Sequence, residues 1–153
     1  MEQKFMRRAL MCAKKAAEIG EVPVGAVITR NGRFVSSGYN RRESGKNALL
    51  HAEITAINRA CKRLGGWRLH ECEMYVTLEP CPMCAGAIIN SRIKTVYIAA
   101  LDPKAGSFGS LCDLSSMPYN HKPEIVSGVM EEESRRLLKD FFKALRDKKI
   151  SSG

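Results

Sequence analysis

The stretch CEMYVTLEPCPMCAGAIINSRIKTVYIAAL, residues 72–101, indicates the fold class. Its first part, residues 72–79, is rich in β-branched, aromatic and other apolar residues and predicts a strand. A helix is predicted after Cys81, because small, helix-compatible residues follow and a proline is tolerated in the first helical turn. The apolar run at 95–101 predicts a second, buried strand. Strand, helix and strand in this order indicate a right-handed crossover within one sheet.

The flanking segments extend this unit into an α/β fold. Apolar residues recur at helical spacing in three of them, and two β-rich runs flank Asn31-Gly32, a dipeptide typical of hairpin turns. The predicted helices span residues 4–19, 51–64 and 131–149, and the predicted strands span residues 24–30, 33–39 and 124–129. We therefore expect one domain, residues 1–153, with a three-layer α/β/α sandwich around a mixed sheet of about five strands.

Composition restricts the compartment and the partner. The chain has 25 Lys and Arg against 16 Asp and Glu, a net charge of +9, which favours a polyanionic partner such as nucleic acid, although a solvated basic surface would give the same charge. No run approaches the roughly 18 apolar residues of a membrane span, and charges interrupt residues 1–15, where a signal peptide would be apolar. We expect a cytoplasmic protein without a membrane partner, in which cysteines are free thiols or metal ligands.

Cys81 and Cys84 form a Cys-x-x-Cys pair at a predicted helix start. The partial positive charge there favours thiolates, which bind zinc. A structural zinc site needs four protein ligands, and the chain has no second such pair; a thioredoxin-like redox pair is the other alternative. His51 begins another helix and is the candidate third ligand, which leaves one coordination position for water. Glu53 follows closely enough to exchange protons with that water.

The motifs HAEITAI and YVTLEPCPMCAGAI resemble those of the cytidine-deaminase superfamily and, within it, the bacterial tRNA-specific adenosine deaminases. The resemblance covers nearly the whole chain, from EVPVGAVI through GYN, GGWRL, SRI and GSL to DFFKALR. It implies conversion of the wobble adenosine of a tRNA anticodon stem-loop to inosine, by a homodimer. It also implies one zinc ion per subunit, held by His51, Cys81 and Cys84, with Glu53 as the proton shuttle.

The same resemblance implies substrate contacts. Asn40 would contact the flipped nucleoside, Ala52 would line the base pocket, and Asp102 would lie near the ribose hydroxyl. Phe142 would belong to an RNA-facing helix, together with the basic residues around it. Each has an ordinary interpretation as well: Asn40 suits a turn, Asp102 precedes a proline in a loop, and aromatic residues of a last helix suit a core.

One departure from the family pattern lies beside the candidate zinc ligand. Many members have Pro-Thr-Ala before this histidine, whereas this chain has Leu49 and Leu50 in those places. Because neighbouring pocket walls set substrate choice in such enzymes, we expect the two leucines to reshape one wall of the pocket mouth.

Two other functions remain open at this point. A deaminase of free guanine, cytosine or a cytidine nucleotide would use the same zinc chemistry, but its small substrate does not require a strongly basic surface. A non-catalytic RNA-binding subunit with a structural zinc ion would not need the carboxylate of Glu53.

Overall fold

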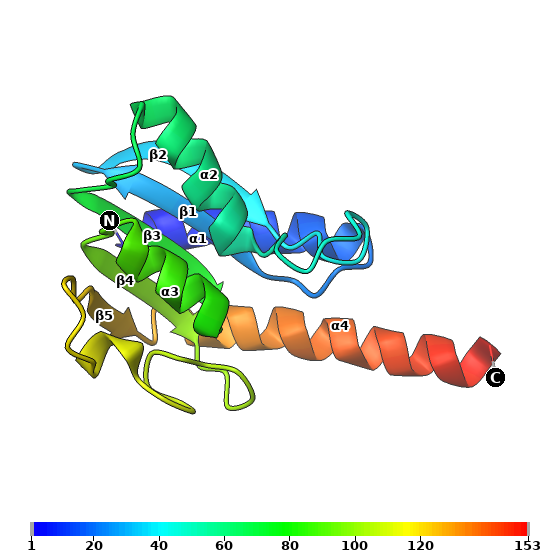
Figure 1. Cartoon of the computed structure of the whole chain (residues 1–153). Helices are drawn as coiled ribbons and strands as arrows, with labels where there is room; N and C mark the ends of the chain where they lie inside the picture. The colour runs from blue at the N-terminus through cyan, green and yellow to red at the C-terminus, as the bar shows by residue number, and fades with distance from the viewer. Residues whose placement is uncertain (1, 153) are drawn as a thin grey trace.

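The computed structural model describes residues 2–152 and has a five-stranded sheet with helices on both faces (Figure 1). The elements are α1 (Glu2–Glu18), β1 (Gly25–Arg30), β2 (Arg33–Tyr39), α2 (Ala52–Leu64), β3 (Cys72–Leu78), α3 (Pro82–Asn90), β4 (Thr95–Ala100), the 3₁₀ turn η1 (Leu114–Ser116), β5 (Glu124–Ser127) and α4 (Glu131–Ser152). Every predicted helix and strand is present. The main difference is α4, which continues to Ser152 where the sequence predicted an end at residue 149.

The sheet is mixed, as predicted, with the strand order β2-β1-β3-β4-β5. Strand β1 is antiparallel to both β2 and β3, whereas β3, β4 and β5 are parallel to one another. It follows that β2 and β3 run in the same direction and end at the same edge of the sheet. The segments that leave these two ends lead to α2 and α3, so the starts of both helices lie at that edge.

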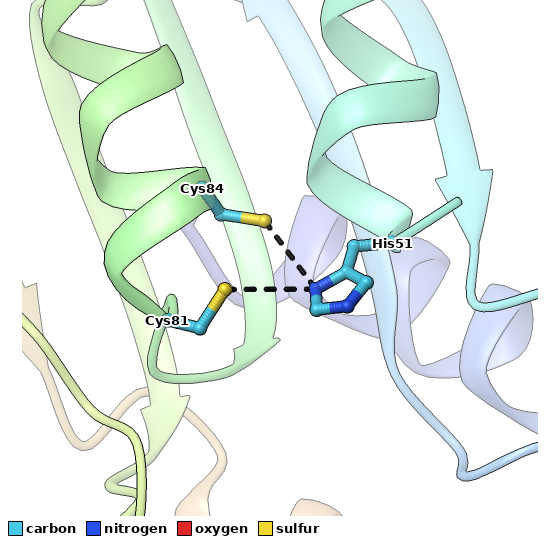
Figure 2. Close-up of side chains that lie close together, drawn as sticks. All are labelled: His51, Cys81 and Cys84. Atoms are coloured by element: carbon cyan, nitrogen blue, oxygen red, sulfur yellow. Dashed lines mark hydrogen bonds between the residues drawn. The ribbon is translucent and has the colours of Figure 1, made fainter. Parts of the chain in front are cut away.

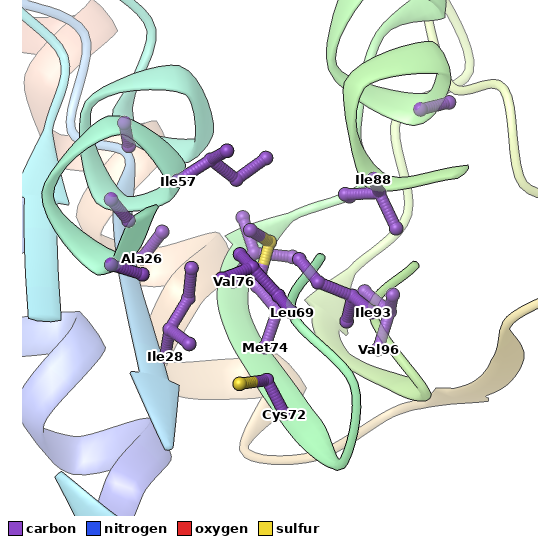
Figure 3. Packing of buried hydrophobic residues seen from close by; sticks show 14 of the residues in the cluster. Ala26, Ile28, Ile57, Leu69, Cys72, Met74, Val76, Ile88, Ile93 and Val96 are labelled. Carbon is purple, nitrogen blue, oxygen red and sulfur yellow. The ribbon is translucent and has the colours of Figure 1, made fainter. Parts of the chain in front are cut away.

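The two faces of the sheet carry separate hydrophobic cores. Alternation along the strands directs Ala26, Ile28, Met74 and Val76 to the face covered by α2 and α3 (Figure 3). Val27, Tyr75 and Ala99 face the other side, where α1 and α4 pack. The three-layer α/β/α sandwich predicted from the sequence is therefore confirmed.

Aromatic rings strengthen the second core. Tyr75 stacks on Tyr97 with ring centroids 4.7 Å apart and contacts Phe5 of α1 at 5.4 Å. Such ring pairs add about 0.5–1.5 kcal/mol each beyond the burial of apolar area. This core anchors the first part of α4, while the second part extends past the sheet (Figure 1).

A close approach fixes α2 on the sheet. A Cβ atom at Gly38 of β2 would lie 2.5 Å from the carbonyl oxygen of Ala52, so only glycine allows this packing. Ser36 adds a buried hydrogen bond from its hydroxyl to the carbonyl of Ala56, 2.7 Å long. Both contacts are made by the first turns of α2, next to His51 and Glu53.

No helix in the part of the chain that the structure describes is both long and apolar enough to cross a lipid bilayer.

Candidate active site

His51 and Cys81 occupy equivalent places, each immediately before a helix. Both have extended backbone angles, φ −80° and ψ 155° for His51 and φ −73° and ψ 175° for Cys81. Neither side chain hydrogen-bonds to the exposed N–H groups of its helix, as a capping residue would. Both side chains instead point toward each other across the edge of the sheet, and Cys84 joins them from the first turn of α3 (Figure 2).

The three side chains have the spacing of zinc ligands. The sulfurs of Cys81 and Cys84 each lie 3.6 Å from Nδ1 of His51, and the three atoms lie within 4.8 Å of one another. A tetrahedral zinc ion with ordinary bond lengths would separate a sulfur and a nitrogen ligand by about 3.5 Å. One imidazole and two thiols in this arrangement therefore fit Zn²⁺. No fourth His, Cys, Asp or Glu joins them among residues 2–152.

The pKa values of the two thiols are shifted in opposite directions. Hydrogen bonds from Cys84 and then from His51 lower the pKa of Cys81 to about 4, against the effect of its burial. The contact with Cys81, together with burial, raises the pKa of Cys84. Cys81 is thus a thiolate at neutral pH. Binding of zinc to these two thiols would release the proton that Cys84 retains, because thiols bind metals as thiolates.

Glu53 lies in the first turn of α2, and its side chain is buried, with 4% of the residue exposed. Burial, and then the negative charge of Cys81, raise the pKa of Glu53 to about 7, while the charge of His51 acts in the opposite direction. A carboxyl group whose pKa lies near neutrality is suited to accept and return a proton. The positive charge of a bound zinc ion would shift this pKa downward and favour the carboxylate.

A cavity of about 180 Å³ opens at this edge of the sheet. It is lined by Val22, Val24, Asn40, Arg42, His51, Ala52, Glu53, Leu78, Glu79, Cys81, Asp102 and Ala105. The structure therefore brings Asn40, Ala52 and Asp102 together with the candidate ligands and Glu53. Its lining combines apolar walls with a few polar groups, as is usual for sites that bind small rings.

Asn40 and Asp102 are also held by their own loops. The side chain of Asn40 accepts a hydrogen bond from the backbone of Arg42 and donates one to the carbonyl of Val22. The Asp102 carboxylate accepts one from the backbone of Lys104. The interpretation of Asn40 as a turn residue thus agrees with its contacts, and both residues still border the cavity.

Three predicted residues lie away from the cavity lining. Phe142 is on the projecting part of α4, is 42% exposed and packs edge to face against Phe141. Leu49 is 56% exposed, and Leu50 packs over Gly45 within its own loop. The expected reshaping of the pocket wall by these two leucines therefore has no counterpart among the residues that line the cavity.

Sequence reasoning did not single out two buried glutamates near the cavity, Glu21 and Glu79. Burial alone would raise the pKa of Glu79, but hydrogen bonds from Ser110, Asp102 and Phe108 lower it below its usual range. The available signal was an acidic residue within VTLEP and at the start of the apolar stretch EVPVGAV. That signal was not specific: both carboxylates bind mostly to backbone N–H groups, and these leave no pattern of residue types in the sequence.

The family model of the cytidine and deoxycytidylate deaminase zinc-binding region matches residues 1–100. This chain belongs to that deaminase family. This chain is 48% identical over 149 residues to the tRNA-specific adenosine deaminase of Bacillus subtilis (strain 168). The match covers 97% of this chain and 92% of the Bacillus subtilis protein. The superfamily predicted from the motifs is therefore confirmed, and it is a family of zinc-dependent hydrolases.

Solved structures agree with the fold of this deaminase. One, from studies of A-to-I editing by tRNA:A34 deaminases at the wobble position of transfer RNA, matches with a TM-score of 0.86 and 43% identity, covering 88% of this chain and 99% of that chain. The guanine deaminase of Bacillus subtilis is less similar, with a TM-score of 0.63 and 33% identity over 94% of this chain and 92% of its own.

Proposed function

We propose that this protein is a zinc-dependent tRNA adenosine deaminase, which hydrolyses adenosine to inosine at the wobble position of an anticodon. One observation carries the proposal: the His51, Cys81 and Cys84 cluster lies beside the buried Glu53 in a cavity. The identity of 48% to a tRNA-specific adenosine deaminase points to the same substrate.

In the proposed mechanism, His51, Cys81 and Cys84 hold one zinc ion and Glu53 moves protons. A zinc ion held by these residues would act as a Lewis acid and make a water molecule in the cavity more acidic. Glu53 accepts the proton of this water through its carboxylate and then delivers protons to a ring nitrogen and to the departing amine. The overall reaction consumes one water and releases ammonia, and it exchanges the exocyclic amine of adenosine for oxygen.

We assign substrate binding to the cavity walls. Ala52 is among the residues that line the cavity, and we assign it to the base pocket next to Glu53. Asn40 contacts the nucleoside from one wall, and Asp102 contacts the ribose from the opposite wall. A single base extruded from the RNA is the part of the substrate that such a pocket admits, as in other enzymes that act on a flipped base.

The anticodon stem-loop is the proposed RNA element, and α4 is its proposed contact. Lys139, Lys143 and Arg146 are exposed on this helix, and Phe142 is exposed beside them. The second half of α4 projects beyond the sheet, where phosphates can approach it from several sides (Figure 1). Electrostatic attraction of this kind supplies most of the sequence-independent affinity for nucleic acid.

We further propose that the chain acts as one domain, in a cytoplasmic homodimer. The support for a dimer is a set of large apolar side chains that are exposed in the segment after the cavity loop, Leu111, Met117 and Tyr119. Contiguous exposed apolar surface often marks contacts between subunits, and we assign these three side chains to such a contact. Sedimentation of the purified protein tests the dimer directly: a monomer at micromolar concentration would contradict it.

The decisive experiment uses the purified zinc-loaded protein and an adenosine-containing anticodon stem-loop. We expect inosine and an equal amount of ammonia, and we expect a chelator to abolish both until zinc is restored. An unmodified stem-loop after prolonged incubation with the zinc-loaded protein would refute the proposal.

A free-base deaminase is the second candidate, favoured by the 33% identity to a guanine deaminase. The same assay with guanine and cytosine distinguishes the two. Turnover of either base without any reaction of the stem-loop would reverse the assignment.

A further inference from the structure

Glu21 and Glu79 are buried carboxylates that are stabilised mainly by hydrogen bonds, and only the charge of Arg42 acts on Glu21 from further away. Each residue is 2% exposed, and neither forms an ion pair with any described residue. Burying a charge in this way is costly unless several hydrogen bonds compensate it. Each carboxylate accepts such hydrogen bonds from a different loop at the cavity.

The carboxylate of Glu79 organises the loop that contains Asp102. It accepts hydrogen bonds from the backbone N–H groups of Asp102 at 3.0 Å and of Phe108 and Ser110 at 3.1 Å. The hydroxyl of Ser110 donates a further hydrogen bond to it. Residues 102–110 therefore wrap around this one side chain.

The wrapping is close enough to exclude a larger residue at Gly106. A Cβ atom there would lie 2.3 Å from the carboxyl carbon of Glu79 and 2.5 Å from the carbonyl oxygen of Asp102. The next residue, Ser107, donates a backbone hydrogen bond of 2.9 Å to the carbonyl of Pro80, directly before Cys81. The loop is thus tied to the segment that carries a zinc ligand.

Glu21 holds the opposite loop in the same manner. Its carboxylate accepts hydrogen bonds from the backbone N–H groups of Glu43 at 3.1 Å and Ser44 at 2.6 Å. Asn40 begins this loop and donates a hydrogen bond of 3.3 Å to the carbonyl of Val22, next to Glu21. Asn40 and Arg42 therefore form a wall of the cavity whose position depends on Glu21.

We propose that Glu21 and Glu79 are positioning residues that hold the two walls of the nucleoside cavity, the Asn40 wall and the Asp102 wall, at a fixed separation. They set how the substrate is bound and oriented and leave zinc retention to His51, Cys81 and Cys84. This inference rests on the proposed deamination of RNA for its kinetic consequences, but its structural content is independent of the substrate.

The kinetic test compares Glu79→Gln and Glu21→Gln with the control Glu71→Gln, whose glutamate is exposed. An amide cannot accept all the hydrogen bonds that the carboxylate accepts, so the loop should lose its fixed position. We expect zinc content equal to that of the unmutated protein and kcat/KM on the stem-loop reduced by roughly 10- to 100-fold, mainly through KM. Glu79→Asp, which keeps the charge, should recover part of the loss. Unchanged kcat/KM, or loss of zinc in parallel with activity, would overturn the inference.

A second variant keeps Glu79 and displaces the loop instead. Gly106→Ala places a methyl group against the Glu79 carboxyl and should reproduce the rise in KM. Amide hydrogen exchange gives a readout that does not require activity: residues 102–110 should exchange at least tenfold faster in Glu79→Gln, and residues 43–44 in Glu21→Gln, with zinc still bound. If unmutated protein does not deaminate the stem-loop, the proposed function fails; if these exchange rates do not change, this inference fails.

Discussion

At the scale of single residues, Glu53 is the candidate proton carrier beside the cluster of His51, Cys81 and Cys84. It is buried in the first turn of α2, two positions after His51, and the start of the helix directs both side chains to the same cavity. In the proposed mechanism His51 supplies a ligand atom, and Glu53 exchanges protons with a water. The division of roles between the two residues can be tested by removing only the carboxylate.

We expect Glu53→Gln to retain zinc and to lose deamination by about 10²- to 10⁴-fold in kcat, the usual contribution of general acid–base catalysis. The amide keeps the size of the side chain but cannot accept a proton. Zinc analysis and inosine formation from the same preparation measure the two effects. Glu71→Gln, at an exposed position away from the cavity, serves as the control and should be fully active. Near-normal turnover by zinc-loaded Glu53→Gln would remove Glu53 from the mechanism.

The lowered pKa of Glu21 predicts how the free energy of unfolding depends on pH. Burial alone would raise the pKa of Glu21, but hydrogen bonds from Ser44 and Glu43 and the charge of Arg42 lower it. A lowered pKa in the folded state stabilises the protein above the pKa of the unfolded chain, about 4.3, and this stabilisation is lost as the pH falls through the folded value. We expect Glu21→Gln to lower the free energy of unfolding at pH 7 by about 1–3 kcal/mol.

The difference between Glu21→Gln and the unmutated protein should shrink as the pH falls from about 5 toward 3, because both then have a neutral side chain at this position. Urea unfolding at several pH values measures it. A difference that stays constant over this pH range would show that the carboxylate charge at Glu21 is not the source of the stability.

The limits of sequence reasoning are clearest at this scale. His51, Glu53, Cys81 and Cys84 were predictable because metal and acid–base chemistry require particular residue types at particular spacings. Glu21 and Glu79 were not, because their hydrogen-bond partners are N–H groups of loops about 20 to 30 residues away in the chain. Any residue except proline offers such a group, so no sequence pattern marks these contacts.

At the scale of elements, the site depends on how closely α2 packs on β2. Gly38 leaves no room for a side chain beneath the carbonyl of Ala52, so the start of α2 sits directly on the sheet. The position of His51 and Glu53 relative to α3 follows from this packing. The sequence predicted each of these elements from periodicity, but not the approach of α2 to β2, which depends on a contact between residues 38 and 52.

We expect Gly38→Ala to lower the free energy of unfolding by about 1–3 kcal/mol through overpacking and to weaken zinc retention, because α2 must move away from β2. Gly86 of α3 is a matched control, since a Cβ there meets no atom within 4 Å. Gly86→Ala should retain zinc and gain up to about 1 kcal/mol from helix propensity. Thermal unfolding and zinc analysis of the two variants provide the comparison, and equal behaviour of both would contradict the role given to Gly38.

At the scale of the whole molecule, the projecting half of α4 carries basic residues and lies apart from the body of the fold. The cavity lies at one edge of the sheet, and the second half of α4 extends from the body as an isolated helix with basic residues (Figure 1). The sequence predicted the helix and its charges. The extension was not predictable, because it depends on where the supporting sheet ends.

We expect the double variant Lys143→Gln and Arg146→Gln to bind the stem-loop more weakly, with little change in kcat at saturating RNA. Phosphate contacts release counterions, so the slope of log K against log salt should fall by about one unit for each charge that contacts a phosphate. Lys94→Gln, at an exposed lysine outside α4, is the control and should leave the slope unchanged. An unaltered slope in the double variant would place the RNA contact elsewhere.

The two helix starts at the cavity link metal binding to the stability of the fold. His51 and Cys81 are 30 residues apart, and each occupies the N-cap position of its helix without capping it. A zinc ion bound by His51, Cys81 and Cys84 would cross-link the β2–α2 half of the chain to the α3–β4 half. Its binding free energy would add to the stability of the folded state. Without the ion the two halves would lack this link, so we expect removal of zinc to lower the free energy of unfolding.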